Sequence, residues 1–459
     1  MKQSSRLDFA WAEKRWNDPL TGTEVIRLSP GRKSHFRSPY FRINMFTDDG
    51  QWTVLCEFEG IEDGREVGDK GLVAVNLVTG EERDLGPVLG NRTSWNCYSA
   101  MRHSHRAVVL NSTDPERWAV DIIDIDTGER RSVVPRRPLP TIQDPGVWAD
   151  ERHLYTPVAT EKAGLARTMH PNDARKMMAA QPGLQDMVRI DLESGEVETV
   201  FQATDWWMGH PNAHPVDPDL FMCCQEWYGE DPDSEWGAAK EHERVRVFDI
   251  EARQWLDIFR TTPFHCPHEH WAPRGRRIYG HSGLLGCHAI NRIDLEAGTN
   301  TWFVGQKGTA RSHHVYIAPD ESFLVGDGMN FDRHCVSEDV RKRAESLVTD
   351  DLFGAGIKRE ITLPSGGETI WKYVLPENSL WDYERFKDDP DALVATIGAE
   401  PERAIDVTPI CRFRSMQRTL MFGYRLESNA HVMPDSRWAV FQSSSEDDWF
   451  EVWAARMPR

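Results

Sequence analysis

One pattern recurs along this chain and constrains its fold more than its composition does: a tight turn of the Pro-Asp or Asp-Gly type, followed at once by a β-rich run. Glycine, asparagine and aspartate favour such turns because they tolerate the backbone conformations that reverse a strand. A repeat of this kind predicts that one supersecondary unit is used many times. The seven copies, of which the second and third are degenerate, are residues 46–58, 101–111, 148–158, 216–225, 272–281, 318–327 and 433–442.

A second pattern, two strands joined by an acidic turn, alternates with the first. Each unit therefore holds about four strands, and the turns recur at intervals of roughly 45–70 residues, which fits propeller blades. The sequence thus predicts a single all-β domain over residues 1–459, a seven-bladed β-propeller. The copies of the second pattern are residues 73–85, 121–134, 188–201, 245–259, 291–304 and a degenerate 370–381.

The last interval between turns is about twice the others, so the propeller carries insertions late in the chain. We expect them at residues 330–366, which include a short helical pattern, and at residues 382–404. The strands at 23–29 and 449–457 have no partner in their own units. Pairing these two strands in one blade would close the ring and remove its exposed sheet edges.

Composition excludes several classes of partner. The 459 residues carry a net charge of −19, and the longest basic run lies among acidic residues, so no surface for nucleic acid is expected. No stretch is apolar for long enough to span a membrane, and the first residues lack the apolar core of a secretory signal. The eight cysteines form no C-x-x-C pair, which favours a reducing compartment. We therefore expect a cytoplasmic protein.

Histidines recur at one register of the repeat. In a propeller the first strand of each blade lines the central channel, and here that strand is the segment before each turn. His268, His314 and Asn429 each lie five positions before the turn proline of their unit. Equivalent positions of consecutive blades lie at one height around the axis, so we expect these side chains to converge. The alternative is that histidine merely suits the turn and hydrogen-bonds to a neighbouring blade.

The fourth unit fits this register less strictly, with His210 and His214 eight and four positions before Pro218. Neutral imidazoles with an oxygen ligand suit Mn²⁺, Zn²⁺ or Fe²⁺, and imidazole is the general base best matched to neutral pH. The stretch HEHW is not the helical H-E-x-x-H of metalloproteases, and the chain has no G-x-S-x-G elbow. These observations favour a metal or proton-transfer site in the channel.

A series of six motifs, in order along most of the chain, is similar to one family. The series is more specific than any single Pro-Asp-Gly turn. On these motifs the chain resembles the oligogalacturonate lyases, seven-bladed propeller polysaccharide lyases that split small pectic uronides. The motifs are residues 18–30, 46–50, 206–211, 268–275, 312–328 and 429–443.

The resemblance implies a β-elimination across the C4–O bond of a uronic acid. In the family a divalent cation, Mn²⁺, binds the sugar carboxylate and acidifies the C5 proton, which a base then removes. The base of the family is the histidine of a Gly-His-Pro motif, which implies His210 in this chain. The His-Glu-aromatic-Trp motif implies His268 as a metal ligand, and the register adds His314 as a further candidate.

The last blade departs from the family, whose metal motif there is Gln-x-x-His-x-His. The matching segment offers His431 and Asn429 as ligands. If His431 takes the last place, Asn429 replaces the other histidine and Leu426 the glutamine; if the turn proline fixes the register, Asn429 takes the last place and Glu427 the one before. Either set suits Mn²⁺ or Ca²⁺, which accept oxygen ligands, and leaves the metal and the substrate open.

Arginines and tryptophans near the first strands are candidate substrate contacts. Arg37, Arg42 and Arg311 could pair with uronate carboxylates, although a solvated surface role is an equal alternative. Trp207 could stack on a sugar ring, whereas core packing is favoured for Trp271.

The leading interpretation is a metal-assisted lyase whose partner is a small uronide oligosaccharide, with no nucleic acid, no membrane and an open oligomeric state. The first alternative is a lyase of the same fold for another uronic-acid glycan, such as one containing glucuronate. The second alternative is a non-catalytic propeller scaffold whose histidines hold a structural ion. A propeller peptidase is disfavoured because the hydrolase domain it needs is missing.

Overall fold

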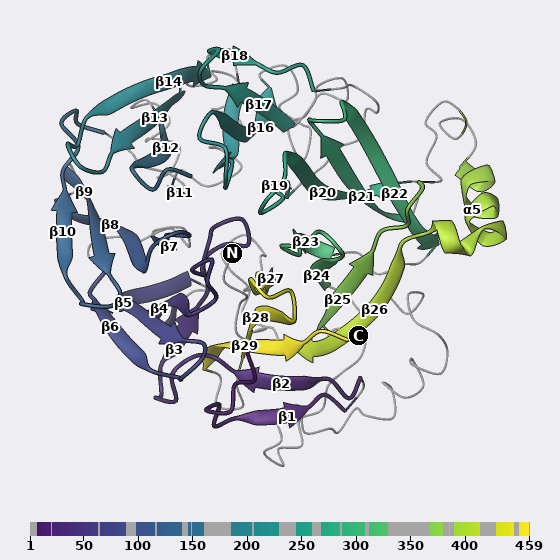
Figure 1. Ribbon diagram of the computed structural model, residues 1–459, viewed down its shortest axis with the longest axis horizontal. Coiled ribbons are helices and arrows are strands. Elements are labelled where there is room, and N and C mark those ends of the chain that lie inside the picture. The colour runs from purple at the N-terminus through teal and green to yellow at the C-terminus, as the bar shows by residue number, and fades with distance from the viewer. Residues whose placement is uncertain are drawn as a thin grey trace.

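Seven antiparallel sheets surround a central axis in the computed structural model of the protein (Figure 1). The predicted seven-bladed β-propeller is therefore confirmed. The structure describes residues 7–19, 21–62, 65–88, 98–114, 117–139, 146–147, 149–159, 185–203, 206–228, 245–258, 268–284, 287–307, 312–328, 368–379, 385, 390–413, 428–444 and 449–458.

Blades 1 to 6 each contain four strands that follow one another in the chain, the first of them innermost (Figure 1). Blade 1 holds β3 (His35–Arg37), β4 (Trp52–Glu62), β5 (Arg65–Asn76) and β6 (Glu82–Gly86). Blade 2 holds β7 (Tyr98–Ala100), β8 (Arg106–Asp114), β9 (Arg117–Asp124) and β10 (Arg130–Val133). Blade 3 holds β11 (Gly146–Val147), β12 (His153–Ala159), β13 (Gln185–Asp191) and β14 (Val197–Ala203).

The second half of the ring continues in the same way, and blade 7 takes strands from both ends of the chain. Blade 4 holds β15 (Trp206–Ala213), β16 (Leu220–Tyr228), β17 (Val245–Asp249) and β18 (Gln254–Trp255). Blade 5 holds β19 (His270–Trp271), β20 (Arg277–Leu284), β21 (Cys287–Asp294) and β22 (Thr299–Lys307). Blade 6 holds β23 (Ser312–Ile317), β24 (Leu324–Gly328), β25 (Glu368–Val374) and β26 (Asp406–Phe413). Blade 7 holds β27 (His431–Val432), β28 (Trp438–Ser444), β29 (Phe450–Arg456), β2 (Glu24–Arg27) and β1 (Arg15–Asn17).

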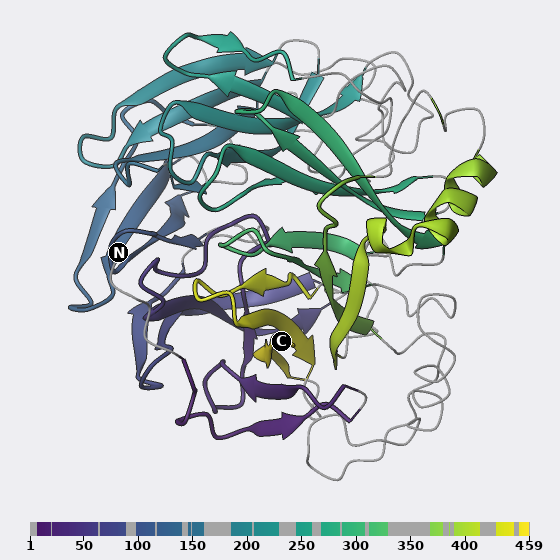
Figure 2. The same ribbon diagram turned by 45° about the vertical axis from the view of Figure 1, so that its right-hand side comes forward.

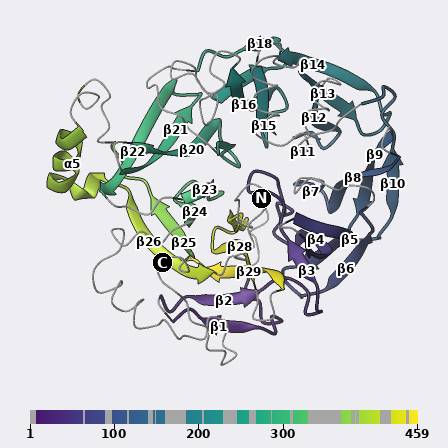
Figure 3. The same ribbon diagram turned by 180° about the vertical axis from the view of Figure 1, so that it is seen from behind.

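Blade 7 closes the ring, as the unpaired terminal strands predicted. Strand β2 pairs antiparallel with β29, and β1 adds a fifth strand outside β2 (Figures 1 and 3). The two faces of β2 reach different neighbours: Val25 packs in the core shared with blade 6, and Ile26 in the core shared with blade 1. Neither residue exposes any surface to solvent. The N-terminal strand is therefore an integral part of the apolar core.

The core lies between the blades because each sheet buries both of its faces against its neighbours. Period-two alternation directs successive side chains of one strand to opposite faces. On β4, Val54 packs toward blade 2 and Leu55 toward blade 7. Trp271 packs in the core between blades 4 and 5, where its indole N–H donates to the carbonyl of Asn212 at 3.0 Å. This bears out the expectation that Trp271 is a core residue.

Insertions lengthen blade 6. One falls between β25 and β26, where an insertion was predicted at 382–404, and contains helix α5 (Pro390–Ala399) and the 3₁₀ helix η1 (Pro401–Arg403). An insertion that is partly helical is thus confirmed, although the helical pattern was predicted for the other insertion. Helix α5 lies at the outer rim beside β22, far from the channel (Figure 2). The insertion predicted at 330–366 lies outside the described residues. Among the helices that the structure describes, none is long and apolar enough to cross a membrane.

The inner strand of blade 1 is interrupted by a loop. Strand β3 ends at Arg37, and Phe46 rejoins the sheet through a single bridge to β4. Between them residues 38–45, here called the channel segment, leave the sheet and cross the middle of the ring (Figure 1). Arg42 Nη1 in this segment donates a hydrogen bond of 2.5 Å to the carbonyl of Pro211 in blade 4. The channel is therefore filled partly by the chain itself.

Candidate active site

The innermost segments of blades 4 to 7 carry polar side chains in two sets, here called the first and second tiers. In each blade the second-tier residue follows the first-tier residue by two positions. The first tier is His210, His268, His314 and Asn429, and the second tier is Asn212, His270, Tyr316 and His431.

The three histidines of the first tier form a cluster of rings in contact. The ring of His268 stacks on that of His210 with centroids 5.6 Å apart and meets the ring of His314 edge-on at 4.5 Å. His268 Nδ1 also lies 3.3 Å from Nε2 of His281, a histidine on the second strand of blade 5. Asn429 adjoins Ser428, whose hydroxyl donates to Asp327, a partner of His314. The structure therefore brings His210, His268 and His314 into contact and places Asn429 next to Ser428, which shares Asp327 with His314.

Three of the four first-tier residues adopt a left-handed backbone conformation. The φ angles are 43° at His210, 58° at His268 and 45° at Asn429. A non-glycine residue in this region is strained by about 1–3 kcal/mol, and such strain is concentrated at functional sites. Three blades thus depart from regular strand geometry at the equivalent position. This shared distortion distinguishes the first tier from an ordinary turn-associated histidine.

His314 is held from both sides. Its Nδ1 lies 3.0 Å from Oδ2 of Asp327, and its backbone N–H donates to Oδ1 of the same carboxylate at 2.6 Å. Its Nε2 lies 3.2 Å from the hydroxyl of Tyr40 in the channel segment. The Ser428 hydroxyl donates a hydrogen bond of 2.9 Å to Asp327 Oδ2, the oxygen that faces His314 Nδ1. Both ring nitrogens of His314 are therefore engaged by protein groups.

Glu269 lies beneath His210 and is fully buried. Its Oε1 is 3.9 Å from Nδ1 of His210. Burial raises the pKa of the Glu269 carboxyl to about 8, an effect that the charge of Arg42 opposes. Among the described residues, one group of three histidine, cysteine or acidic side chains brings its ligand atoms within 4.8 Å of one another, and it comprises His210, Cys224 and Glu269.

The two histidines of the second tier are buried and neutral. His270 Nε2 accepts a hydrogen bond of 3.0 Å from the Ile317 N–H, and its ring stacks on Tyr316 at 5.4 Å. His431 Nδ1 donates to the carbonyl of Asn429 at 2.7 Å, and its ring contacts Tyr316 at 5.3 Å. Burial lowers the pKa of His270 to about 3 and that of His431 to about 4. Both rings are therefore uncharged at neutral pH.

The remaining predicted site residues fall in different places. Arg37 is buried, with its guanidinium 5.8 Å from the ring centroid of Phe58 rather than in the first tier. Arg42 lies in the channel segment, bound to the Pro211 carbonyl. Trp207 belongs to β15, but its side chain is outside the described part of the structure, and Arg311 is outside it altogether. Arg42 therefore lies in the channel, whereas Arg37 packs against Phe58 of blade 1.

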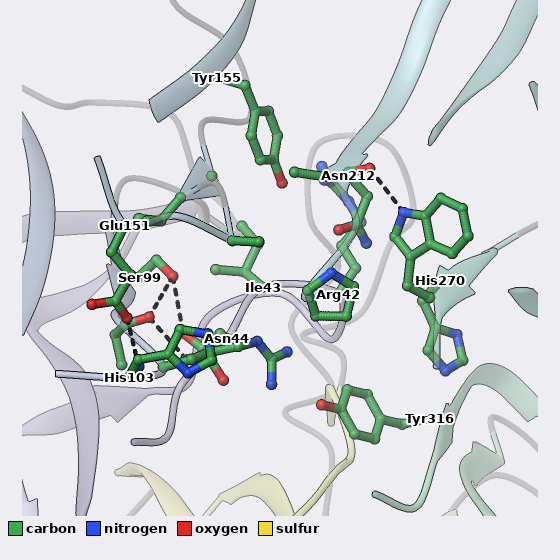
Figure 4. Close-up of a pocket in the computed structure, with 18 residues that line it drawn as sticks. Arg42, Ile43, Asn44, Ser99, His103, Glu151, Tyr155, Asn212, His270 and Tyr316 are labelled. Atoms are coloured by element: carbon green, nitrogen blue, oxygen red, sulfur yellow. Dashed lines mark hydrogen bonds between the residues drawn. The ribbon is translucent and has the colours of Figure 1, made fainter. Parts of the chain in front are cut away.

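A hollow lies on the second-tier side of the channel (Figure 4). The channel segment forms one wall with Arg42 and Asn44, and the second tier forms another with Asn212, His270 and Tyr316. Blades 2 and 3 complete the hollow, and no first-tier residue lines it. The hollow is therefore separate from the histidine cluster.

Five residues around the first tier were not predicted. Three of them lie on the second strands of their blades, next to the inner strand that lines the channel. The other two had no role assigned to them from the sequence. A polar residue recurs eight positions after the turn proline in blades 5 to 7, a signal that would have found His281 and Asp327. The residues are Tyr40, Cys224, Glu269, His281 and Asp327.

Comparisons with known proteins agree with this geometry. The oligogalacturonate lyase of Dickeya dadantii is 22% identical over 363 residues, which cover 72% of this chain and 78% of the relative. The oligogalacturonide lyase of Pectobacterium atrosepticum is 21% identical over 350 residues, 68% of this chain and 74% of the relative. No family model matches the chain. The resemblance to the oligogalacturonate lyase family is confirmed.

Solved oligogalacturonate lyases have the same fold. The crystal structure of the Vibrio parahaemolyticus oligogalacturonate lyase superposes with a TM-score of 0.64 at 16% identity and covers 97% of both chains. An oligogalacturonate lyase in complex with manganese gives a TM-score of 0.63, also at 16% identity, over 97% of this chain and 96% of that one. At this identity the superpositions establish the propeller, and the chemistry of the site must be argued from the residues of this chain.

Proposed function

We propose that the protein is a metal-assisted lyase that cleaves short uronic-acid oligosaccharides, oligogalacturonides first among them, by β-elimination in the cytoplasm. The observation that carries the proposal is the first tier, in which His210 and His268 from adjacent blades are stacked, strained and partly exposed. The names of the sequence relatives, and the manganese bound by one structural relative, support it.

The residues of the first tier fit a divalent cation. Asn429 is buried, and none of the described residues hydrogen-bonds to its Oδ1, so an oxygen ligand lies unused beside the histidine cluster. With the partly exposed imidazole of His268 it provides the nitrogen and oxygen donors that Mn²⁺ accepts. We place the cation against these two residues. The sequence also predicted His314 and His431 as ligands, but Asp327 and Tyr40 engage both ring nitrogens of His314 and the Asn429 carbonyl engages Nδ1 of His431, so the proposal does not depend on them. A bound cation would supply charge neutralisation for the uronate carboxylate as its α-proton becomes acidic.

His210 is the base in this proposal. Its side chain is 18% exposed, so one face of the ring reaches a substrate in the channel. Its Nδ1 lies 3.9 Å from Oε1 of Glu269, and in this proposal the imidazole takes the C5 proton. An imidazole suits this role because its ordinary pKa lies near neutrality. The buried ring of Phe41 contacts that of His268 and excludes water from one side of the cluster.

The test is an ultraviolet absorbance assay with di- and trigalacturonate, first with Mn²⁺ and then with a chelator. Elimination leaves a conjugated C4–C5 double bond that absorbs, whereas hydrolysis leaves none. We expect a metal-dependent rise that His210→Ala reduces by about 10²–10⁴-fold, the usual contribution of a general base. His105→Ala, a change at a blade 2 histidine bound to Asp49 and Asp126, is the matched control and should retain activity. A flat trace with Mn²⁺ bound contradicts the pectic assignment.

The second candidate function is elimination from a different uronide, and the changed residues of the last blade favour it. Asn429 stands where the family motif has histidine in either register, and a changed ligand shell can alter how the sugar carboxylate is seated. The same assay with glucuronate-containing disaccharides separates the two specificities. Metal binding without elimination of any uronide would instead identify a non-catalytic scaffold.

A further inference from the structure

The hollow on the second-tier side of the channel has no part in the proposed lyase chemistry (Figure 4). Its volume is about 50 Å³, which is room for about four water-sized groups. The side chain of His103, one of its lining residues, is half exposed and marks the side on which the hollow meets solvent. A polar hollow of this size holds water or the end of a small ligand.

The hollow carries positive charge within an acidic protein. Arg42 and Arg102 line it, and Glu151 is the acidic residue among the described residues of its wall, whereas the whole chain has a net charge of −19. Both oxygens of the Glu151 carboxylate are engaged by blade 2: Oε1 accepts the backbone N–H of His103 and Oε2 the hydroxyl of Ser104, each at 2.6 Å. The charge of the hollow therefore favours an anionic ligand.

Arg102 is the cation of the hollow that is best placed to bind a ligand. Its side chain is 24% exposed, and its ion pair with Asp48 is long, at 3.6 Å, and open to solvent. Such a pair contributes little stability, and Asp48 also faces His103 Nδ1 at 3.1 Å. The Arg102 guanidinium interacts with the Tyr316 hydroxyl as well. Because a guanidinium has five N–H donors in a planar fork that matches a carboxylate, Arg102 can bind an acid while it keeps these neighbours.

Two tyrosine hydroxyls face the hollow from opposite sides. Tyr155 of blade 3 and Tyr316 of blade 6 have buried rings and direct their hydroxyls toward the middle of the hollow (Figure 4). A Cβ at Gly146 would overlap the Tyr155 hydroxyl, so this glycine leaves the space that the hydroxyl occupies. A hydroxyl donates readily to a carboxylate oxygen. The two tyrosines thus add neutral donors to the positive charge of the arginines.

We propose that the hollow is a second binding site, which takes the carboxylate of a small organic acid or sugar acid. Arg102 binds the carboxylate, Arg42 adds positive charge from the channel segment, and the hydroxyls of Tyr155 and Tyr316 complete the shell. An acetate-sized group of about four heavy atoms fills the hollow, so the remainder of a larger acid extends past His103 toward solvent. The site is separate from the histidine cluster and does not depend on the proposed lyase activity.

Equilibrium dialysis of the metal-free protein tests this site. Mn²⁺ is removed with a chelator that is then dialysed away, so that the histidine cluster holds no cation for a carboxylate. The ligands are radiolabelled galacturonate and acetate, with galactose as the neutral counterpart, in a buffer free of carboxylates. Arg152, an exposed arginine of blade 3 that pairs with Asp191, supplies the matched control. Binding and melting temperature are measured for wild type, Arg102→Gln, Tyr155→Phe, His210→Ala and Arg152→Gln.

We expect the metal-free protein to bind one equivalent of either acid and no galactose. Arg102→Gln should weaken this binding by about tenfold or more and Tyr155→Phe by about two- to tenfold, because each removes a donor to the carboxylate. His210→Ala and Arg152→Gln should bind as wild type does. Galacturonate that binds more tightly than acetate identifies a sugar acid as the ligand, and equal binding identifies a simple carboxylate.

Three results would overturn the site. The first is no binding of either acid up to about 10 mM, and the second is equal binding of galactose. The third is binding that His210→Ala weakens or that neither hollow variant changes, because the acid then binds elsewhere. If Arg102→Gln lowers the melting temperature, Tyr155→Phe decides, since it removes a single hydroxyl and keeps the ring. A failure of the lyase assay leaves this proposal standing, because the dialysis requires no catalysis.

Discussion

At the scale of single residues, His214 shows how the backbone sets the charge of a histidine. Its Nδ1 accepts hydrogen bonds from the N–H groups of Val216 and Asp217 at 3.1 and 2.7 Å, and its Nε2 donates to the Gly275 carbonyl at 3.1 Å. The neutral form satisfies all three bonds, and a proton on Nδ1 would break two. Burial, the largest cause, lowers the pKa of His214 from 6.5 to about 4.

This gives a prediction about acid stability. The unfolded chain binds a proton at His214 more readily than the folded protein does, so the contribution of this residue is complete above pH 6.5 and is lost as the pH falls toward 4. The shift corresponds to about 3 kcal/mol. We expect the free energy of unfolding in urea, measured with chelator between pH 7.5 and 4, to fall less steeply for His214→Asn than for wild type.

His105 is the matched control for that measurement. Burial opposes its charge, but hydrogen bonds and charges from Asp49 and Asp126 prevail and raise its pKa. Its contribution is therefore present below the ordinary histidine pKa and is lost as the pH rises through the raised value. His105→Asn should change the pH profile in the opposite sense. Parallel profiles for the two variants would contradict the assignment of His214 as a neutral histidine.

At the scale of elements, the hairpin turns between the outer strands share one sequence pattern, but their glycines have different neighbours. Gly128 and Gly195 occupy the same place in the Asp-Thr-Gly and Glu-Ser-Gly turns of blades 2 and 3, with φ of 74° and 75°. A Cβ at Gly128 would meet nothing within 4 Å, whereas a Cβ at Gly195 would lie 2.5 Å from the backbone carbonyl of Val134. Because Gly195 has no side chain, it thus also allows the close contact between blades 2 and 3.

The two alanine variants separate the cost of the turn from the cost of the contact. Gly128→Ala should lower the free energy of unfolding by about 1–2 kcal/mol, the strain of a left-handed residue with a Cβ. Gly195→Ala should lower it by about 1–3 kcal/mol more, because the backbone must move to accommodate the methyl group. Chemical denaturation of both variants measures the difference. Equal losses of stability in the two variants would mean that the backbone of blade 2 moves away from the methyl group without lowering the free energy of unfolding.

The inner strands show how far an element could be predicted from sequence. The spacing to the turn proline placed His268, His314 and Asn429 at one height because a strand has a fixed rise per residue and the blades are copies of one unit. The same reasoning did not find Tyr40, because the channel segment lies outside the repeat and reaches His314 only through the folded ring. A pattern within one blade predicts the position of a residue along its strand. It does not predict which residues of other blades that residue contacts across the channel.

At the scale of the whole molecule, ring closure joins the ends of the chain. Val25 and Ile26 on β2 pack into the cores of two different blades, and Arg27 forms a buried ion pair of 3.3 Å with Glu451. Removing this strand would open the ring, expose the edge of β29 and leave both cores with cavities.

Deletion of residues 1–30 should therefore abolish cooperative folding. We expect the truncated chain to aggregate or to lose its thermal transition, as measured by circular dichroism and size-exclusion chromatography. Glu24→Ala keeps β2 but removes surface ion pairs with Arg15 and Arg456, and it should melt close to wild type because such pairs contribute little. A truncated chain that folds with an unchanged melting temperature would refute the closure of the ring by β2.

The sequence by itself determined the propeller, its seven blades, the closing strand and the height at which the inner histidines meet, because each of these follows from local periodicity repeated along the chain. Only the tertiary structure decided which nitrogen of each histidine is used. Within HEHW, His268 joins the first tier while His270 is bound by the backbone of the next blade and Glu269 is buried beneath His210. Hydrogen-bond partners from other blades set these roles, and no spacing within one blade encodes them.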